Sequence, residues 1–150
     1  MLKLARTIHF DEADPGKFDS PAESGEWAVS GGFAFANWTD AETTAKKQFA
    51  FSSGWLGGES FGRAKLVIVA QIHEMELEEL RQNLADHMLK LYNAPSADVA
   101  MVAAIHEVEF MQELCEDQDL DTLLAINRVL TDDGVREQYR AIKPQAPNIN

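Results

Sequence analysis

A short, almost wholly apolar segment constrains the fold of this chain more than any other feature. Residues 64–72 (AKLVIVAQI) directly follow a glycine-rich stretch, residues 54–62 (GWLGGESFG). In an extended strand Leu66 and Ile68 point to one face and Val67 points to the other, so both faces of its middle are apolar. Such a strand must be covered on both sides, which predicts a central position in a sheet with helices packed against it.

Helical spacing predicts the elements that supply this cover. Apolar residues recur at spacings of three and four through residues 74–91, and polar residues take most of the remaining positions. Ser96 can cap a second long helix over residues 97–116, whose apolar surface is broad. Thr39 and Glu42 form a capping box that predicts a short helix over residues 40–52.

Alternating patterns indicate further strands. Residues 2–10 alternate apolar and polar side chains, and residues 26–37 (EWAVSGGFAFAN) are strand material interrupted by two glycines. We interpret the second segment as a hairpin, with one long bulged strand as the alternative. Residues 123–130 and 135–142 flank an Asp-Gly turn, although the second arm also fits helical spacing.

These elements predict an α+β fold. We expect an antiparallel or mixed sheet of about five strands, two long helices packed on one face and one short helix. The 150 residues suffice for one hydrophobic core, so we assign residues 1–143 to a single globular domain and residues 144–150 to a flexible tail.

Charge and cysteine content exclude several classes of function. The formal net charge is −12, which repels nucleic acid and anionic membranes. The longest apolar run, residues 66–70, is far shorter than the roughly 20 residues that span a bilayer. The single cysteine, Cys115, cannot form an internal disulfide, so we expect a cytoplasmic protein.

Two short motifs resemble a metal site and a catalytic nucleophile, but the residues around them differ from those that such sites require. The run 117–121 (DQDLD) resembles the start of a calcium-binding EF-hand loop, but Thr122 and Arg128 stand where that loop needs glycine and glutamate. The GxSxG at residues 58–62 is followed by a strand pattern, whereas a nucleophile elbow leads into a helix. We therefore predict no metal, no cofactor and no catalytic residues, and a structural role for Cys115.

The glycine-rich segment is the best candidate for a binding site. Trp55, Gly57, Gly58 and Arg63 could together hold a small anion, with an aromatic wall, close backbone N–H groups and a guanidinium. The alternative is a tight connection with an aromatic plug, in which Arg63 pairs with a carboxylate such as Glu59.

Four segments carry a resemblance to a known family: 26–36 (EWAVSGGFAFA), 60–64 (SFGRA), 114–117 (LCED) and 122–126 (TLLAI). With them the chain resembles a bacterial family of small proteins known only as a domain of unknown function. The resemblance implies an accessory protein encoded near molybdenum-containing oxidoreductases, and it brings no catalytic residue with it.

The sequence thus favours a noncatalytic protein over an enzyme. We expect a binding or assembly module that acts through a protein partner or by self-association, because no acid, base and nucleophile converge. The alternative is a small-molecule protein, sensory or enzymatic, with an anionic ligand at residues 54–63.

Overall fold

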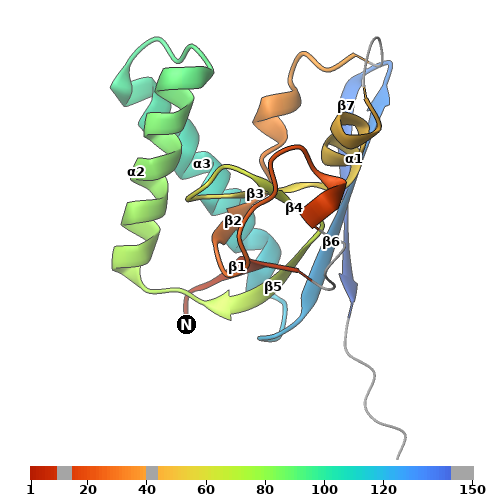
Figure 1. Cartoon of the computed structure of the whole chain (residues 1–150). Helices are drawn as coiled ribbons and strands as arrows, with labels where there is room; N and C mark the ends of the chain where they lie inside the picture. Colours follow the sequence, from red (N-terminus) through yellow and green to blue (C-terminus); the bar gives the residue numbers. More distant parts are fainter. Residues whose placement is uncertain (10–14, 40–43, 143–150) are drawn as a thin grey trace, which may run out of the picture.

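The chain folds around a curled, seven-stranded antiparallel sheet (Figure 1). The computed structural model describes residues 1–9, 15–39 and 44–142. The strands are β1 (Lys3–Ile8), β2 (Trp27–Val29), β3 (Trp55–Gly57), β4 (Arg63–Ala64), β5 (Leu66–Gln71), β6 (Leu123–Thr131) and β7 (Gly134–Ile142). Their order is β4-β3-β2-β1-β5-β6-β7, so the sheet has more strands than the five expected. The prediction missed β3 and β4, because two or three residues carry no readable alternation.

The apolar segment forms β5, an interior strand of the sheet that lies next to the central strand β1. It pairs with β1 on one side and with β6 on the other. Val67 and Val69 are completely buried and Leu66 is nearly so, whereas Ile68 is half-buried. One face of the strand is therefore fully covered and the other only in part.

The two long helices are confirmed at the predicted boundaries, α2 (Glu74–Leu91) and α3 (Ala97–Glu116). Ser96 caps α3 by accepting a hydrogen bond from the Val99 N–H at 3.2 Å. Figure 1 shows α2 and α3 side by side, and α3 lies against β1. The third helix, α1 (Ala45–Ser53), lies apart from them beside β6. The long helices lie together, but of the two α3 makes the main contact with the sheet, so the predicted packing of both helices on one face is matched only roughly. The short helix makes a separate contact.

The predicted hairpin over residues 26–37 is wrong. After β2 the chain turns at Gly31, which has a φ of +74°, and enters the 3₁₀ turn η2 (Gly32–Phe35). That turn buries Phe35 with its ring centroid 5.4 Å from that of Phe51. A returning strand would leave Phe35 outside the core, so burial of this ring favours the tight turn.

The short helix begins later than the capping box predicts. Thr44 is the N-cap, since its hydroxyl accepts from the Lys47 N–H at 3.2 Å, and α1 runs from Ala45 to Ser53. Most of the predicted box, including Glu42, and the predicted tail lie outside the described residues.

The predicted turn at Asp133–Gly134 is confirmed. β6 and β7 pair without interruption from Thr131↔Gly134 to Leu123↔Ile142, so the second arm is a strand and not a helix. Among the described residues no helix is both long and apolar enough to cross a membrane.

Candidate functional site

The glycine-rich turn holds a carboxylate of the protein itself. Glu26 is buried, and its two oxygens accept from the backbone N–H groups of Glu23, Glu59 and Ser60 at 2.7, 3.0 and 2.7 Å. The Ser60 hydroxyl adds a fourth hydrogen bond at 2.7 Å. A Cβ at Gly57 would lie 2.6 Å from the nearer Glu26 oxygen, so glycine is needed for this approach. The turn is an anion nest whose anion is internal.

Arg63 does not contribute to this nest. Its guanidinium donates to three backbone carbonyls, those of Ser30 at 3.4 Å, Gly54 at 3.2 Å and Gly31 at 3.2 Å. It also lies over the Phe35 ring, 4.6 Å from the centroid. Burial and the neighbouring Arg128 guanidinium lower the pKa of Arg63.

The four residues predicted to bind a ligand are therefore divided between two environments. Gly57 and Gly58 belong to the turn around Glu26: the Gly57 amide closes the turn onto the Gly62 carbonyl and the Gly58 amide binds the Trp27 carbonyl. Trp55 is completely buried, with its ring 5.9 Å from that of Tyr139. An external anion at this segment would have to compete with Glu26, and ligand binding by these residues stays a prediction.

Arg128 is the central residue that the sequence analysis missed. Its side chain is fully buried and donates to the carbonyls of Phe51 at 3.0 Å and Gly54 at 2.8 Å, and also to that of Ser30. The first two carbonyls belong to the C-terminal end of α1, where a cation also meets the negative end of the helix dipole. Arg128 thus ties β6 to α1 and to the turn after β2.

Two carboxylates balance the two arginines. Glu137 on β7 accepts from the Arg128 Nε at 3.0 Å and from the Ser30 hydroxyl at 2.5 Å, both at its Oε2 atom. Glu107 on α3 accepts from the Gly31 N–H at 2.8 Å at its Oε1 atom. Burial, reinforced by the Glu137 charge, raises the pKa of Glu107. The second oxygen of each carboxylate makes no hydrogen bond to a described residue.

A groove of about 460 Å³ opens above these carboxylates, between α3, η2 and β7. We call it the α3–β7 groove. Its lining includes Phe33 and Met88 as apolar walls, Phe110 at one rim and the polar Ser30, Glu107 and Glu137. The Phe33 ring contacts Tyr92 edge to face at 5.2 Å, and the Phe110 ring lies 5.7 Å from Tyr139. The groove therefore joins aromatic walls to two partly unpaired carboxylates.

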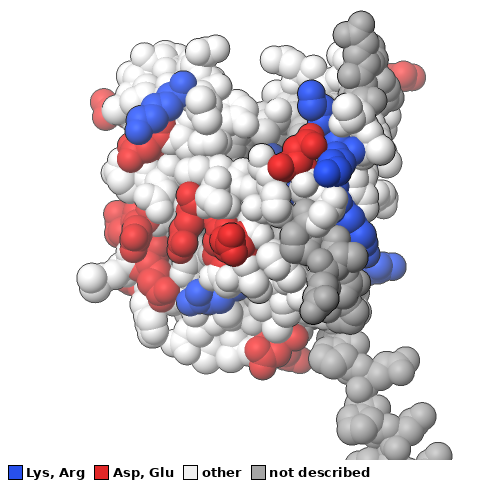
Figure 2. All heavy atoms as spheres, in the orientation of Figure 1, with Lys and Arg blue, Asp and Glu red and all other residues white. Residues whose placement is uncertain are grey.

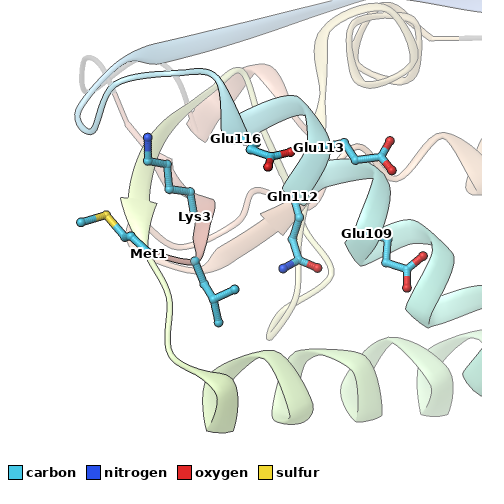
Figure 3. Close-up of a pocket in the computed structure, with 7 residues that line it drawn as sticks. Met1, Lys3, Glu109, Gln112, Glu113 and Glu116 are labelled. Carbon is cyan, nitrogen blue, oxygen red and sulfur yellow. The ribbon is translucent and has the colours of Figure 1, made fainter.

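A second hollow, of about 250 Å³, lies between the N-terminus and α3 and is lined in part by Glu109, Glu113 and Glu116. Figure 3 shows that these three carboxylates point in separate directions and do not converge. Lys3 beside them already donates to the Gln118 carbonyl at 2.7 Å. Within the described ranges no group of three histidine, cysteine or acidic residues could hold a metal ion.

The remaining reactive side chains have internal roles. Ser60 of the GxSxG donates to Glu26 and accepts from the Gly62 N–H at 3.1 Å. His87 stacks on Phe61, with ring centroids 3.8 Å apart, and burial lowers its pKa. Cys115 is completely buried, and desolvation raises the pKa of its thiol to about 12. The thiol therefore has the inert character predicted for a structural cysteine.

Comparison with known proteins gives a family but no activity. The model of a family of unknown function, DUF6505, matches residues 1–150. The chain belongs to this family. No curated protein and no solved structure matches it. The match supports one part of the resemblance seen in the sequence, namely membership of a family of unknown function. A function for this chain must therefore be inferred from the geometry of its sites.

Proposed function

We propose that the protein is a noncatalytic binding or assembly module that acts through protein–protein contacts. Its contact surface would be the α3–β7 groove together with the adjoining outer face of α3. The observation that carries the proposal is the exposure of large apolar side chains there: Phe110 is 40% exposed, Val99 49% and Val102 53%. Exposed large apolar side chains on one helix beside a groove are typical of interaction sites on soluble proteins.

The chemistry of the groove supports one kind of partner segment. Phe33, Met88 and Phe110 offer apolar contact, whereas Glu107 and Glu137 each keep one carboxylate oxygen without a hydrogen bond to a described residue. The whole chain carries a formal charge of −12, which attracts a basic partner. We therefore assign the groove to an amphipathic segment of another protein, with a lysine or arginine among apolar residues.

The resemblance to accessory proteins supports the setting of this proposal. A bacterial, cytoplasmic helper of a molybdenum-containing oxidoreductase would need a surface of this kind to hold its partner. The single buried cysteine fits a reducing compartment. The alternative function, an anion site at residues 54–63, would require its ligand to displace Glu26 from four hydrogen bonds.

A displayed library of random short peptides tests the proposal with a defined probe. We expect selection on the parent protein to enrich peptides that combine a basic residue with aromatic or aliphatic ones. Phe110→Ser should abolish this enrichment, and Glu107→Gln should abolish the preference for a basic residue. The matched controls lie outside the groove. Leu120→Ser, at a residue that is 42% exposed, is the control for the loss of an apolar side chain in Phe110→Ser, and Glu113→Gln is the control for the loss of charge in Glu107→Gln.

Two outcomes would refute the proposal. One is selection of no consensus, or of a consensus that survives both groove substitutions. The other is a dimer in sedimentation velocity that Phe110→Ser converts to a monomer, because the occupant of the groove would then be a second copy of this chain.

A further inference from the structure

A larger hollow lies on the other side of the molecule, where the sheet splits. β5 pairs with β6 only from Ile68↔Leu123 to Leu66↔Ala125, whereas β6 continues to Thr131 in its pairing with β7. Beyond Ala125 the place beside β6 is taken by α1. The opening between them is a pocket of about 590 Å³, lined by Ser53, Lys65, Ala125, Ile126, Asn127, Gln138, Tyr139 and Arg140. We call it the Lys65–Arg140 pocket.

The pocket is positively charged in an acidic protein. Lys65 and Arg140 are the basic residues of its lining, and no carboxylate of residues 1–9, 15–39 or 44–142 lines it. Neither cation makes a hydrogen bond or an ion pair with any described residue. Figure 2 shows the wider pattern: carboxylates gather on the side of α2, and lysines and arginines gather on the side of α1 and β7. Two cations that have no partner within the described part of the chain are therefore held at one hollow, in a protein of net charge −12.

The two cations come from segments on either side of β6. Ala125 of β6 pairs with Leu66 of β5 on one side and with Arg140 of β7 on the other. Lys65 lies in the bend directly before Leu66, so a single strand separates the segments that carry Lys65 and Arg140, and both residues line the pocket. The neighbouring pair Asn127↔Gln138 adds two amide side chains, which can donate to an oxygen anion.

We propose that the Lys65–Arg140 pocket binds a small-molecule anion that carries a carboxylate or phosphate group. Arg140 would hold two of its oxygens in a fork and Lys65 would act as a point charge. The amides of Asn127 and Gln138 would bind polar groups of the ligand, and Tyr139 would form an apolar wall. The volume lies within the range of about 300–1,000 Å³ that is typical of ligand pockets. This inference is independent of the peptide groove.

Titration with defined anions tests the site. Inorganic phosphate and citrate serve as probes in separate arms, sodium chloride at matched ionic strength serves as the blank, and the side-chain amide signals of Asn127 and Gln138 are followed by NMR. We expect saturable shifts with at least one probe. The double variant Lys65→Gln/Arg140→Gln should bind that probe about tenfold more weakly or worse, because it loses the hydrogen bonds from both charged side chains.

Arg136→Gln is the matched control. Arg136 lies on β7 four residues before Arg140 and outside the pocket lining, so its loss should leave the affinity unchanged. Shifts that do not saturate with either probe would overturn the proposal. Equal affinity of the double variant and the parent would do the same, and so would an equal loss in Arg136→Gln, because a general charge effect would then explain the binding.

Discussion

Replacement of Glu26 by glutamine tests whether the glycine-rich turn depends on an internal anion. In the parent, the two Glu26 oxygens accept four hydrogen bonds, three from backbone N–H groups and one from the Ser60 hydroxyl. The amide nitrogen of glutamine must replace one of these oxygens. At Oε1 it would face two backbone N–H groups that cannot rotate, those of Glu59 and Ser60. At Oε2 it would face the Glu23 N–H and a hydroxyl that can turn and accept.

The magnitude follows from the less costly orientation. With the amide nitrogen at Oε2, the hydrogen bond from the Glu23 N–H is lost and the other three lose their charge assistance. A hydrogen bond to a charged group contributes about 1.5–3 kcal/mol and a neutral one about 1 kcal/mol. The lowest of these values add up to about 3 kcal/mol, so we expect Glu26→Gln to lower the free energy of unfolding by at least about 3 kcal/mol.

Urea unfolding followed by tryptophan fluorescence measures this loss. Glu23→Gln is the control, because Glu23 is exposed and contributes only its backbone N–H to the turn. Glu26→Ala removes the carboxylate from the glycine-rich turn, so formate can bind there in its place. Added formate should therefore raise the urea midpoint of this variant and leave the midpoint of the parent unchanged. A Glu26→Gln variant within about 0.5 kcal/mol of the parent would refute the reasoning, because a surface substitution has that effect.

Three further predictions concern the buried charges and the thiol. Arg128→Met should lower the free energy of unfolding by about 3–5 kcal/mol in the same urea assay, because it leaves the Glu137 carboxylate without its cation and removes one donor each from the carbonyls of Phe51 and Gly54; an unchanged midpoint would contradict the assigned contacts. Burial raises the pKa of Glu107, so this carboxyl ionises at a lower pH in the unfolded state than in the folded protein, and its contribution to the free energy of unfolding falls as the pH rises above about 4.5. The stability of Glu107→Gln relative to the parent should therefore increase over that range. Parallel pH profiles of the two proteins would contradict this. The Cys115 thiol, with a pKa of about 12, should resist a thiol reagent at pH 8 until urea unfolds the chain, and fast labelling of the native protein would show that it is accessible.

Local sequence patterns predicted the elements whose stability is local. α2 and α3 begin and end where helical spacing and the Ser96 cap place them, and β5 is an interior strand because both of its faces are apolar. β3 and β4, which the sequence analysis did not predict, contain only three and two residues. Such short strands are stabilised by pairing with their neighbours in the sheet, so the residues around them show no alternation of apolar and polar side chains that would predict a strand. The error at residues 26–37 has the same origin, since the burial of Phe35 depends on the distant Phe51.

The chemistry of the glycine-rich turn was partly accessible from the sequence. Glycines beside a strand do expose backbone N–H groups that gather around an anion. The identity of that anion depends on a pairing between β2 and β3 that brings Glu26 beside residues more than thirty positions away.

The sequence gives a weaker indication of the role of Arg128. This residue continues the alternation of Leu124 and Ile126 on the buried face of β6, where a charged residue implies buried partners.

The two arginines explain why carboxylates are present at the groove. A curled sheet that closes on a 3₁₀ turn and a helix end buries carbonyls which no strand can satisfy, here those of Ser30, Gly31 and Gly54. Guanidinium groups supply the missing donors, but two of them in one core need counter-charges. Glu107 and Glu137 provide these from α3 and β7, and each uses one oxygen for internal hydrogen bonds. The second oxygen of each carboxylate is then left for the groove, so the requirement that stabilises the fold also places there the hydrogen-bond acceptors that a basic partner segment would use.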